Sequence, residues 1–131
     1  VFYCIFHLLM KYQDIMARAL ISVNTSTTAL QIAKMMEQGG IGAIIVKEND
    51  APKGIVTDRD FATKIAANSL SLDTTAEKIM SSPLITINHN EPISAAAERM
   101  TNKKIRKLAV TENGKIIGLI TSTDLVTQLA K

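Results

Sequence analysis

Gly54-Ile55-Val56-Thr57-Asp58-Arg59-Asp60 decides the fold, because the same pattern returns as Gly118-Leu119-Ile120-Thr121-Ser122-Thr123-Asp124. Each copy runs Gly, two apolar residues, Thr, two further residues and Asp. When the chain is shifted by 64 residues it overlays on itself without a gap, so that Asp14-Ile15-Met16 falls on Lys78-Ile79-Met80. Self-similarity at a fixed period indicates two copies of one supersecondary unit.

Each copy is expected to fold as strand, helix, strand, strand and helix. In the first copy the short β-branched run Leu20–Val23 predicts a strand, and the hydroxyls of Thr25–Thr28 supply caps for a helix that Gly39-Gly40 ends. The rest of that copy is predicted as strands at Ala43–Val46 and Gly54–Thr57 and a closing helix at Asp58–Ala67.

The second copy has equally clear signals for a helix start and a turn. Asn90-Glu91-Pro92 predicts a helix start with Pro in its first turn, and Asn113-Gly114 between two apolar runs predicts a tight hairpin. Short helices are expected at Met10–Ala17 and Thr75–Met80, leading into the two copies. The chain therefore divides into an apolar segment (1–11), a first repeat (12–67), a linker (68–75) and a second repeat (76–131).

Composition narrows the class of protein. The chain has 131 residues, of which 47% are hydrophobic and 21% charged, and this balance excludes a disordered chain. The single cysteine excludes an internal disulfide and a zinc site built on paired cysteines, and it favours the reducing cytosol as the compartment. The two histidines are too isolated to suggest a metal site, so no cofactor is expected beyond a regulatory ligand.

The first ten residues, Val1–Met10, are almost wholly apolar. They are too few to span a bilayer, which takes about 20 apolar residues, and they lack the features of a signal peptide. We expect this segment to be covered by the protein's own core or by a partner chain, because a contiguous apolar patch is unusual on a monomer. The segment therefore predicts a homodimer or a larger assembly.

The repeated motif has a chemistry of its own. An ionised carboxylate only accepts hydrogen bonds, so one Asp can accept from both vicinal hydroxyls of a ribose. The Thr three residues earlier stands just before a helix, where its hydroxyl and the free N–H groups can meet phosphate or ribose. The alternative is that Asp60 and Asp124 merely cap their helices. Neither aspartate is expected in the core.

The duplicated Gly-x-x-Thr-x-x-Asp, each copy closing a β-α-β-β-α unit, resembles the CBS-domain pair over residues 12–131. The resemblance implies an α/β (α+β) fold of two tandem repeats with pseudo-two-fold symmetry, whose sheets pack together and leave two clefts. In that family the clefts bind adenosine-containing ligands such as AMP, ADP, ATP or S-adenosylmethionine. It also implies pairing of two chains into a flat disc of four repeats.

Carried over by position, the resemblance assigns each cleft to one repeat's motif and two segments of the other repeat. One cleft would hold Thr57, Arg59 and Asp60 with Leu84, Ile105, Arg106 and Lys107. The other would hold Thr121, Thr123 and Asp124 with Ala19, Leu20, Ile41, Gly42 and Ala43. Because Arg106-Lys107 is doubly positive where Gly42-Ala43 is neutral, the Asp60 cleft is expected to favour the more phosphorylated ligand.

Three other classes of function have less support in the sequence than the binding of an adenosyl ligand. The sequence offers no nucleophile–base pair or carboxylate dyad, so we do not expect an enzyme. A nucleic-acid-binding protein could use the basic stretch Lys103–Lys107, but no helix-turn-helix or zinc pattern supports it, and nucleic acid is an unlikely partner. A third possibility is a ligand-free dimerisation module. The favoured prediction is a regulatory module that binds an adenosyl ligand and signals to a regulated protein of unknown identity.

Overall fold

The computed structural model describes residues 11–17 and 20–130, with residues 128–130 described through their backbone. The chain forms two compact units. The first unit is Leu20–Leu84, and the second unit joins the segment before Leu20 to the chain from Ile85 onward. The apolar segment before Lys11, and with it the expected assembly surface, lies outside the described residues.

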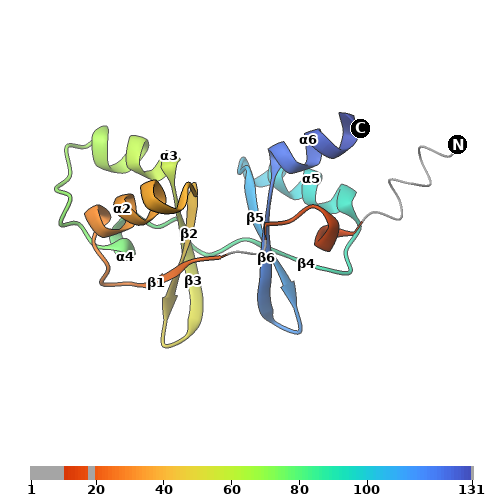
Figure 1. The fold of residues 1–131 in the computed structure, drawn as a ribbon, viewed down its shortest axis with the longest axis horizontal. Coiled ribbons are helices and arrows are strands. Elements are labelled where there is room, and N and C mark those ends of the chain that lie inside the picture. The colour runs from red at the N-terminus through yellow and green to blue at the C-terminus, as the bar shows by residue number, and fades with distance from the viewer. Residues whose placement is uncertain (1–10, 18–19, 131) are drawn as a thin grey trace, which may run out of the picture. The chain divides into compact units, whose positions relative to one another are not determined.

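The first unit is a three-stranded sheet with its helices on one face (Figure 1). Its strands are β1 (Ser22–Asn24), β2 (Ala43–Glu48) and β3 (Ala51–Thr57), with β1 parallel to β2 and β2 antiparallel to β3. Its helices are α2 (Ala29–Gly39), α3 (Asp58–Asp60), which continues as the π-helix η2 (Phe61–Ala66), and α4 (Ala76–Ile79).

The second unit repeats this plan with β4 (Thr86–Asn88), β5 (Lys107–Glu112), β6 (Lys115–Thr121), α5 (Ile93–Lys103) and α6 (Ser122–Ala130). The pairing register also repeats, because Ala43 faces Thr57 in one sheet and Lys107 faces Thr121 in the other. The predicted element order and α/β class are confirmed.

Local signals explain where the helices begin and end. Thr28 caps α2, since its hydroxyl accepts from the N–H of Gln31 at 3.3 Å and the Gln31 side chain accepts from the N–H of Thr28 at 3.0 Å. Gly40 ends α2 in the left-handed conformation, with φ of 61°. In the second unit Lys104 takes this position with φ of 56°, although it bears a side chain.

The segment that leads into each repeat packs in the unit formed by the other repeat, and we call these two stretches the exchanged segments. Tyr12 and Met16, which precede the first repeat, are buried in the core of the second unit with Leu108. Ala76 and Ile79, which precede the second repeat, are buried in the core of the first unit. Short antiparallel bridges hold both segments, Ile55 to Ser81 in one unit and Ala17 to Leu119 in the other.

Two predicted helices differ from those observed. The helix predicted at Met10–Ala17 is, in its described part, a single 3₁₀ turn, η1 (Tyr12–Asp14), because the chain then runs out to Ala17, which bridges Leu119 on the edge strand β6. The helix predicted at Asp58–Ala67 changes from α to π geometry at Phe61. Among the described residues, no helix has the length and hydropathy needed to cross a membrane.

Candidate ligand-binding motifs

Both Thr-x-x-Asp motifs lie where the last strand of a unit meets its closing helix. Thr57 ends β3 and Thr121 ends β6. In each motif a carboxylate oxygen of the Asp accepts the backbone N–H of the Thr, at 2.8 Å for Asp60 and 2.9 Å for Asp124. Both aspartates therefore cap the start of their helices, and any ligand must use the acceptor positions that remain.

Asp60 is buried, with 4% of its surface exposed, so the expectation that neither aspartate belongs to the core is wrong for this residue. Its Oδ2 accepts the Thr57 N–H and, at 3.3 Å, the Thr57 hydroxyl. Its Oδ1 accepts the Ser81 hydroxyl at 3.0 Å and forms an ion pair with Lys64 Nζ at 3.0 Å. Burial is tolerated because the charge is both paired and hydrogen-bonded.

Lys64 joins Asp60 to the segment that follows α4. Its Nζ donates to the carbonyl of Ile79 at 2.8 Å and to the carbonyl of Met80 at 3.2 Å. The backbone of Ser81 is itself fixed to β3, because its N–H donates to the carbonyl of Ile55 at 2.8 Å. Asp60, Lys64 and Ser81, here called the Asp60 clamp, thus tie the start of the closing helix to the exchanged segment.

Asp124 has different surroundings. It is half-buried, and within the described part of the chain its carboxylate has the Thr121 N–H as its one hydrogen-bond donor. Its own N–H donates to the Thr121 hydroxyl at 3.1 Å, so that hydroxyl is turned toward the helix start. At the positions that match Ser81 and Lys64, the second unit has Ala17 and Gln128, which bring neither a hydroxyl nor a cation.

Each motif also has a backbone neighbour from the residue just before the middle strand of its own unit, β2 or β5. The Asp58 N–H donates to the carbonyl of Gly42 at 3.3 Å, and the Ser122 N–H donates to the carbonyl of Arg106 at 2.8 Å. Arg106 is exposed at this place. Through its backbone, an exposed arginine therefore adjoins the Asp124 motif where the Asp60 motif has a glycine.

The structure distributes the predicted site residues between the units. The first unit contains Leu20, Ile41, Gly42, Ala43, Thr57, Arg59, Asp60 and Leu84. The second unit contains Ile105, Arg106, Lys107, Thr121, Thr123 and Asp124, while Ala19 lies outside the described residues. Sequence reasoning missed Lys64 and Ser81. The spacing of Asp60 and Lys64, four residues apart, was a usable signal for an ion pair, whereas nothing local pointed to Ser81.

The partly buried groups whose pKa values are shifted, Tyr12, Glu91 and Arg99, lie at α5 and away from both motifs. Burial, reinforced by the nearby Glu91 carboxylate, raises the pKa of Tyr12 to about 12. The Tyr12 hydroxyl donates to the carbonyl of Pro92 at 2.7 Å. Hydrogen bonds from Arg99 lower the pKa of Glu91, whose Oε1 lies 2.8 Å from Arg99 Nη2. The Tyr12 hydroxyl thus holds the N-terminal segment to the second unit, and this gives it a structural role.

The described residues hold no group of three or more His, Cys, Asp or Glu side chains that could bind a metal ion. What the two motifs offer is a carboxylate beside a helix start, twice, in a fold made of two β-α-β-β-α units. This arrangement defines a tandem-repeat class of protein in which each motif places carboxylate acceptors beside a helix start, and acceptors of this kind can receive the hydroxyl groups of a polyhydroxylated molecule.

Comparison with known proteins gives the family. The CBS-domain family model matches residues 13–67 and 76–131. An uncharacterized protein of Methanopyrus kandleri is 36% identical over 116 residues, and the CBS domain-containing protein YhcV of Bacillus subtilis is 30% identical over 113 residues. These alignments cover 86% of this chain, and they span 59% of the first relative and 81% of the second. The chain belongs to the CBS-domain family and carries a tandem pair.

Solved structures agree with this assignment. A protein with CBS domains from Burkholderia ambifaria has a TM-score of 0.85 at 30% identity, over 92% of this chain and 93% of that one. The CBS domain protein PAE2072 from Pyrobaculum aerophilum, solved in complex with AMP, has a TM-score of 0.80 at 27% identity, over 92% of this chain and 98% of that one.

Proposed function

We propose that this CBS pair is a regulatory module that binds an adenosine-containing ligand, with AMP the first candidate. The observation that carries the proposal is the Asp124 carboxylate, which is half-buried at a helix start and has a single donor among the described residues. Acceptor positions beside a helix N-terminus suit a ribose diol and a nearby phosphate. The AMP complex of the Pyrobaculum aerophilum relative supports the same chemistry.

Arg106 supplies the charge that such a ligand needs. It is exposed, and its backbone bonds to Ser122, the first residue of α6. A guanidinium can form charge-assisted bonds to phosphate, so AMP and ATP should bind more tightly than adenosine. ADP, ATP and S-adenosylmethionine are the other candidate ligands.

The output of the module would be a change in partner binding. A ligand regulates a partner through its differential affinity for two states of the protein, and no separate catalytic step is needed. We propose a non-catalytic role in the reducing cytosol and a homodimeric assembly, which the apolar N-terminal decamer and the single cysteine suggest.

Isothermal titration of the chain with AMP, ATP, S-adenosylmethionine and a short DNA duplex tests the proposal. We expect binding of at least one adenosyl ligand and a loss of that affinity of about tenfold or more in Asp124→Ala, as removal of a charged acceptor implies. Binding of the duplex alone would favour a nucleic-acid role for Lys103–Lys107. Binding of none of the four would favour the ligand-free dimerisation module.

A further inference from the structure

Building on the proposed function, we propose that the two motifs have different roles: the Asp124 motif binds the nucleotide, and the Asp60 motif is closed by its own Lys64 and Ser81. The pair would then bind one AMP-like ligand per chain. Of the two aspartates, Asp60 would be a structural residue and Asp124 the ligand-binding one.

The first argument is the number of donors on each carboxylate. A carboxylate has about four lone-pair positions. Asp60 already meets four donors, namely the Thr57 N–H, the Thr57 hydroxyl, the Ser81 hydroxyl and Lys64 Nζ. A ribose diol would have to displace Lys64 or Ser81 from a side chain that is 6% exposed. Asp124 receives a single donor among the described residues and can accept the diol without a loss.

The second argument is that the sequence itself accounts for the difference. Ser81 and Ala17 occupy equivalent bridges, to Ile55 and to Leu119 respectively. Lys64 and Gln128 occupy equivalent positions in the closing helices, four residues after the Asp. The second unit therefore has neither a serine nor a lysine at the positions whose side chains close the first, and this difference lies in the sequence itself.

The third argument is charge. The Asp124 motif has Arg106 beside it in its own unit, whereas the Asp60 motif has Gly42. Arg59 does stand one residue before Asp60, but the acidic Asp58 and Asp60 flank it. The sequence-based expectation assigned Arg106 and Lys107, and with them the more phosphorylated ligand, to the Asp60 cleft. This inference departs from it because four donors already occupy the Asp60 carboxylate and the backbone of Arg106 adjoins the Asp124 motif.

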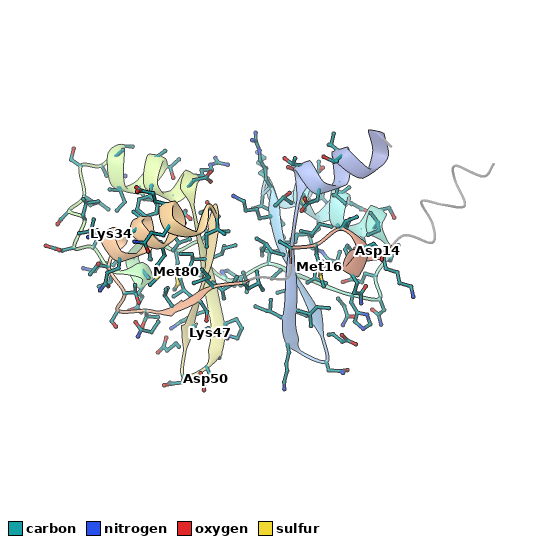
Figure 2. The ribbon with its side chains drawn as sticks, in the orientation of Figure 1. Asp14, Met16, Lys34, Lys47, Asp50 and Met80 are labelled. Carbon is teal, nitrogen blue, oxygen red and sulfur yellow. The ribbon has the colours of Figure 1, made fainter. Side chains whose placement is uncertain are left out.

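Stoichiometry of AMP binding, measured by titration calorimetry on the full chain, tests the inference. We expect one AMP per chain in the wild type, with affinity reduced about tenfold or more in Asp124→Asn. The variant Lys64→Gln/Ser81→Ala gives the first unit the residue types of the second at these two positions. We expect it to bind a second AMP per chain, more weakly than the first, because Gly42 stands where the second unit has Arg106. Lys34→Gln, on the exposed surface of α2 (Figure 2), controls for the lost positive charge, and this variant should still bind one AMP per chain.

Circular dichroism and thermal melting establish that each variant is folded before its stoichiometry is read. Two AMP per wild-type chain would overturn this inference while the proposed function stands. One AMP that Asp124→Asn leaves in place would overturn the assignment of the ligand to Asp124, here and in the proposed function, while adenosyl-ligand binding itself stands. A folded Lys64→Gln/Ser81→Ala variant that still binds one AMP would overturn the closure by Lys64 and Ser81. Absence of AMP binding in every variant, with no other adenosyl ligand bound, would overturn the proposed function and this inference together.

Discussion

The Asp60 and Asp124 motifs have the same backbone hydrogen bond but different side chains around the carboxylate. Both accept the N–H of their own Thr at nearly the same distance, 2.8 and 2.9 Å. Asp60 is buried and also bonds to Lys64 and to the Ser81 hydroxyl. Asp124 is half-buried, and among the described residues its carboxylate accepts from the Thr121 N–H alone. A repeated motif thus specifies the helix start in both places, while neighbouring side chains decide what the remaining lone pairs do.

The exchanged segments show the same contrast. In the first unit, Lys64 Nζ holds the segment after α4 through the carbonyls of Ile79 and Met80. In the second unit, the equivalent segment is held by buried Tyr12, beside the Glu91–Arg99 ion pair. The first unit therefore has a buried, ion-paired carboxylate at its motif, whereas the Tyr12 contact and the Glu91–Arg99 pair of the second unit lie beside α5.

The largest expected effect is on the free energy of unfolding, which Asp60→Ala should lower more than Asp124→Ala. Removing Asp60 leaves the partly buried Lys64 without its carboxylate, and we expect a cost of about 2–3 kcal/mol, less than for a fully buried pair because Lys64 is 34% exposed. Removing Asp124 deletes a helix cap, which costs about 1 kcal/mol. Urea unfolding of both variants checks this, and equal losses would contradict the contrast between the two motifs.

A middle-sized effect concerns the glycine that opens the first motif. A Cβ on Gly54 would lie 2.7 Å from the carbonyl oxygen of Ser81 and 2.9 Å from the sulfur of Met80, which Figure 2 labels. Gly54→Ala must therefore push the exchanged segment away from Asp60, and we expect a cost of about 1–3 kcal/mol.

Gly39→Ala is the matched control for that variant. A Cβ on Gly39 would meet the Ile41 side chain at 3.5 Å, which is ordinary contact, so Ala should stabilise the protein by about 0.4–1 kcal/mol. Thermal melts of the two variants should shift in opposite directions. A Gly54→Ala variant as stable as the wild type would show that the exchanged segment yields easily.

The smallest effect is at Tyr12 and depends on pH. Because its pKa is raised to about 12 from the usual value near 10, the tyrosine stabilises the fold fully below pH 10 and loses that contribution as the pH rises toward 12. Tyr12→Phe removes the bond to Pro92, at a cost of about 1 kcal/mol at neutral pH, and should show a smaller alkaline loss. Parallel pH-dependent unfolding of the two proteins measures the difference; identical alkaline profiles would contradict it.

The sequence predicted the parts of this molecule that depend on local pattern. The 64-residue repeat and the strand and helix order follow from spacing and side-chain type. Capping by the motif Asp stood as the alternative to ligand binding, and the structure shows it in both motifs. The Asp60 clamp and the Tyr12 contact join residues 21 and 80 positions apart. Such pairings depend on the exchange of the leading segments between units, which no local pattern encodes, and for this reason the sequence did not predict that Lys64 and Ser81 bind the Asp60 carboxylate.

A crystal structure of the protein grown with AMP tests the central claim most directly. The account predicts the ribose hydroxyls of AMP within hydrogen-bond distance of the Asp124 carboxylate, and Asp60 still bonded to Lys64 and Ser81 with no nucleotide beside it. A ribose on Asp60, with Lys64 displaced from the carboxylate, would contradict it.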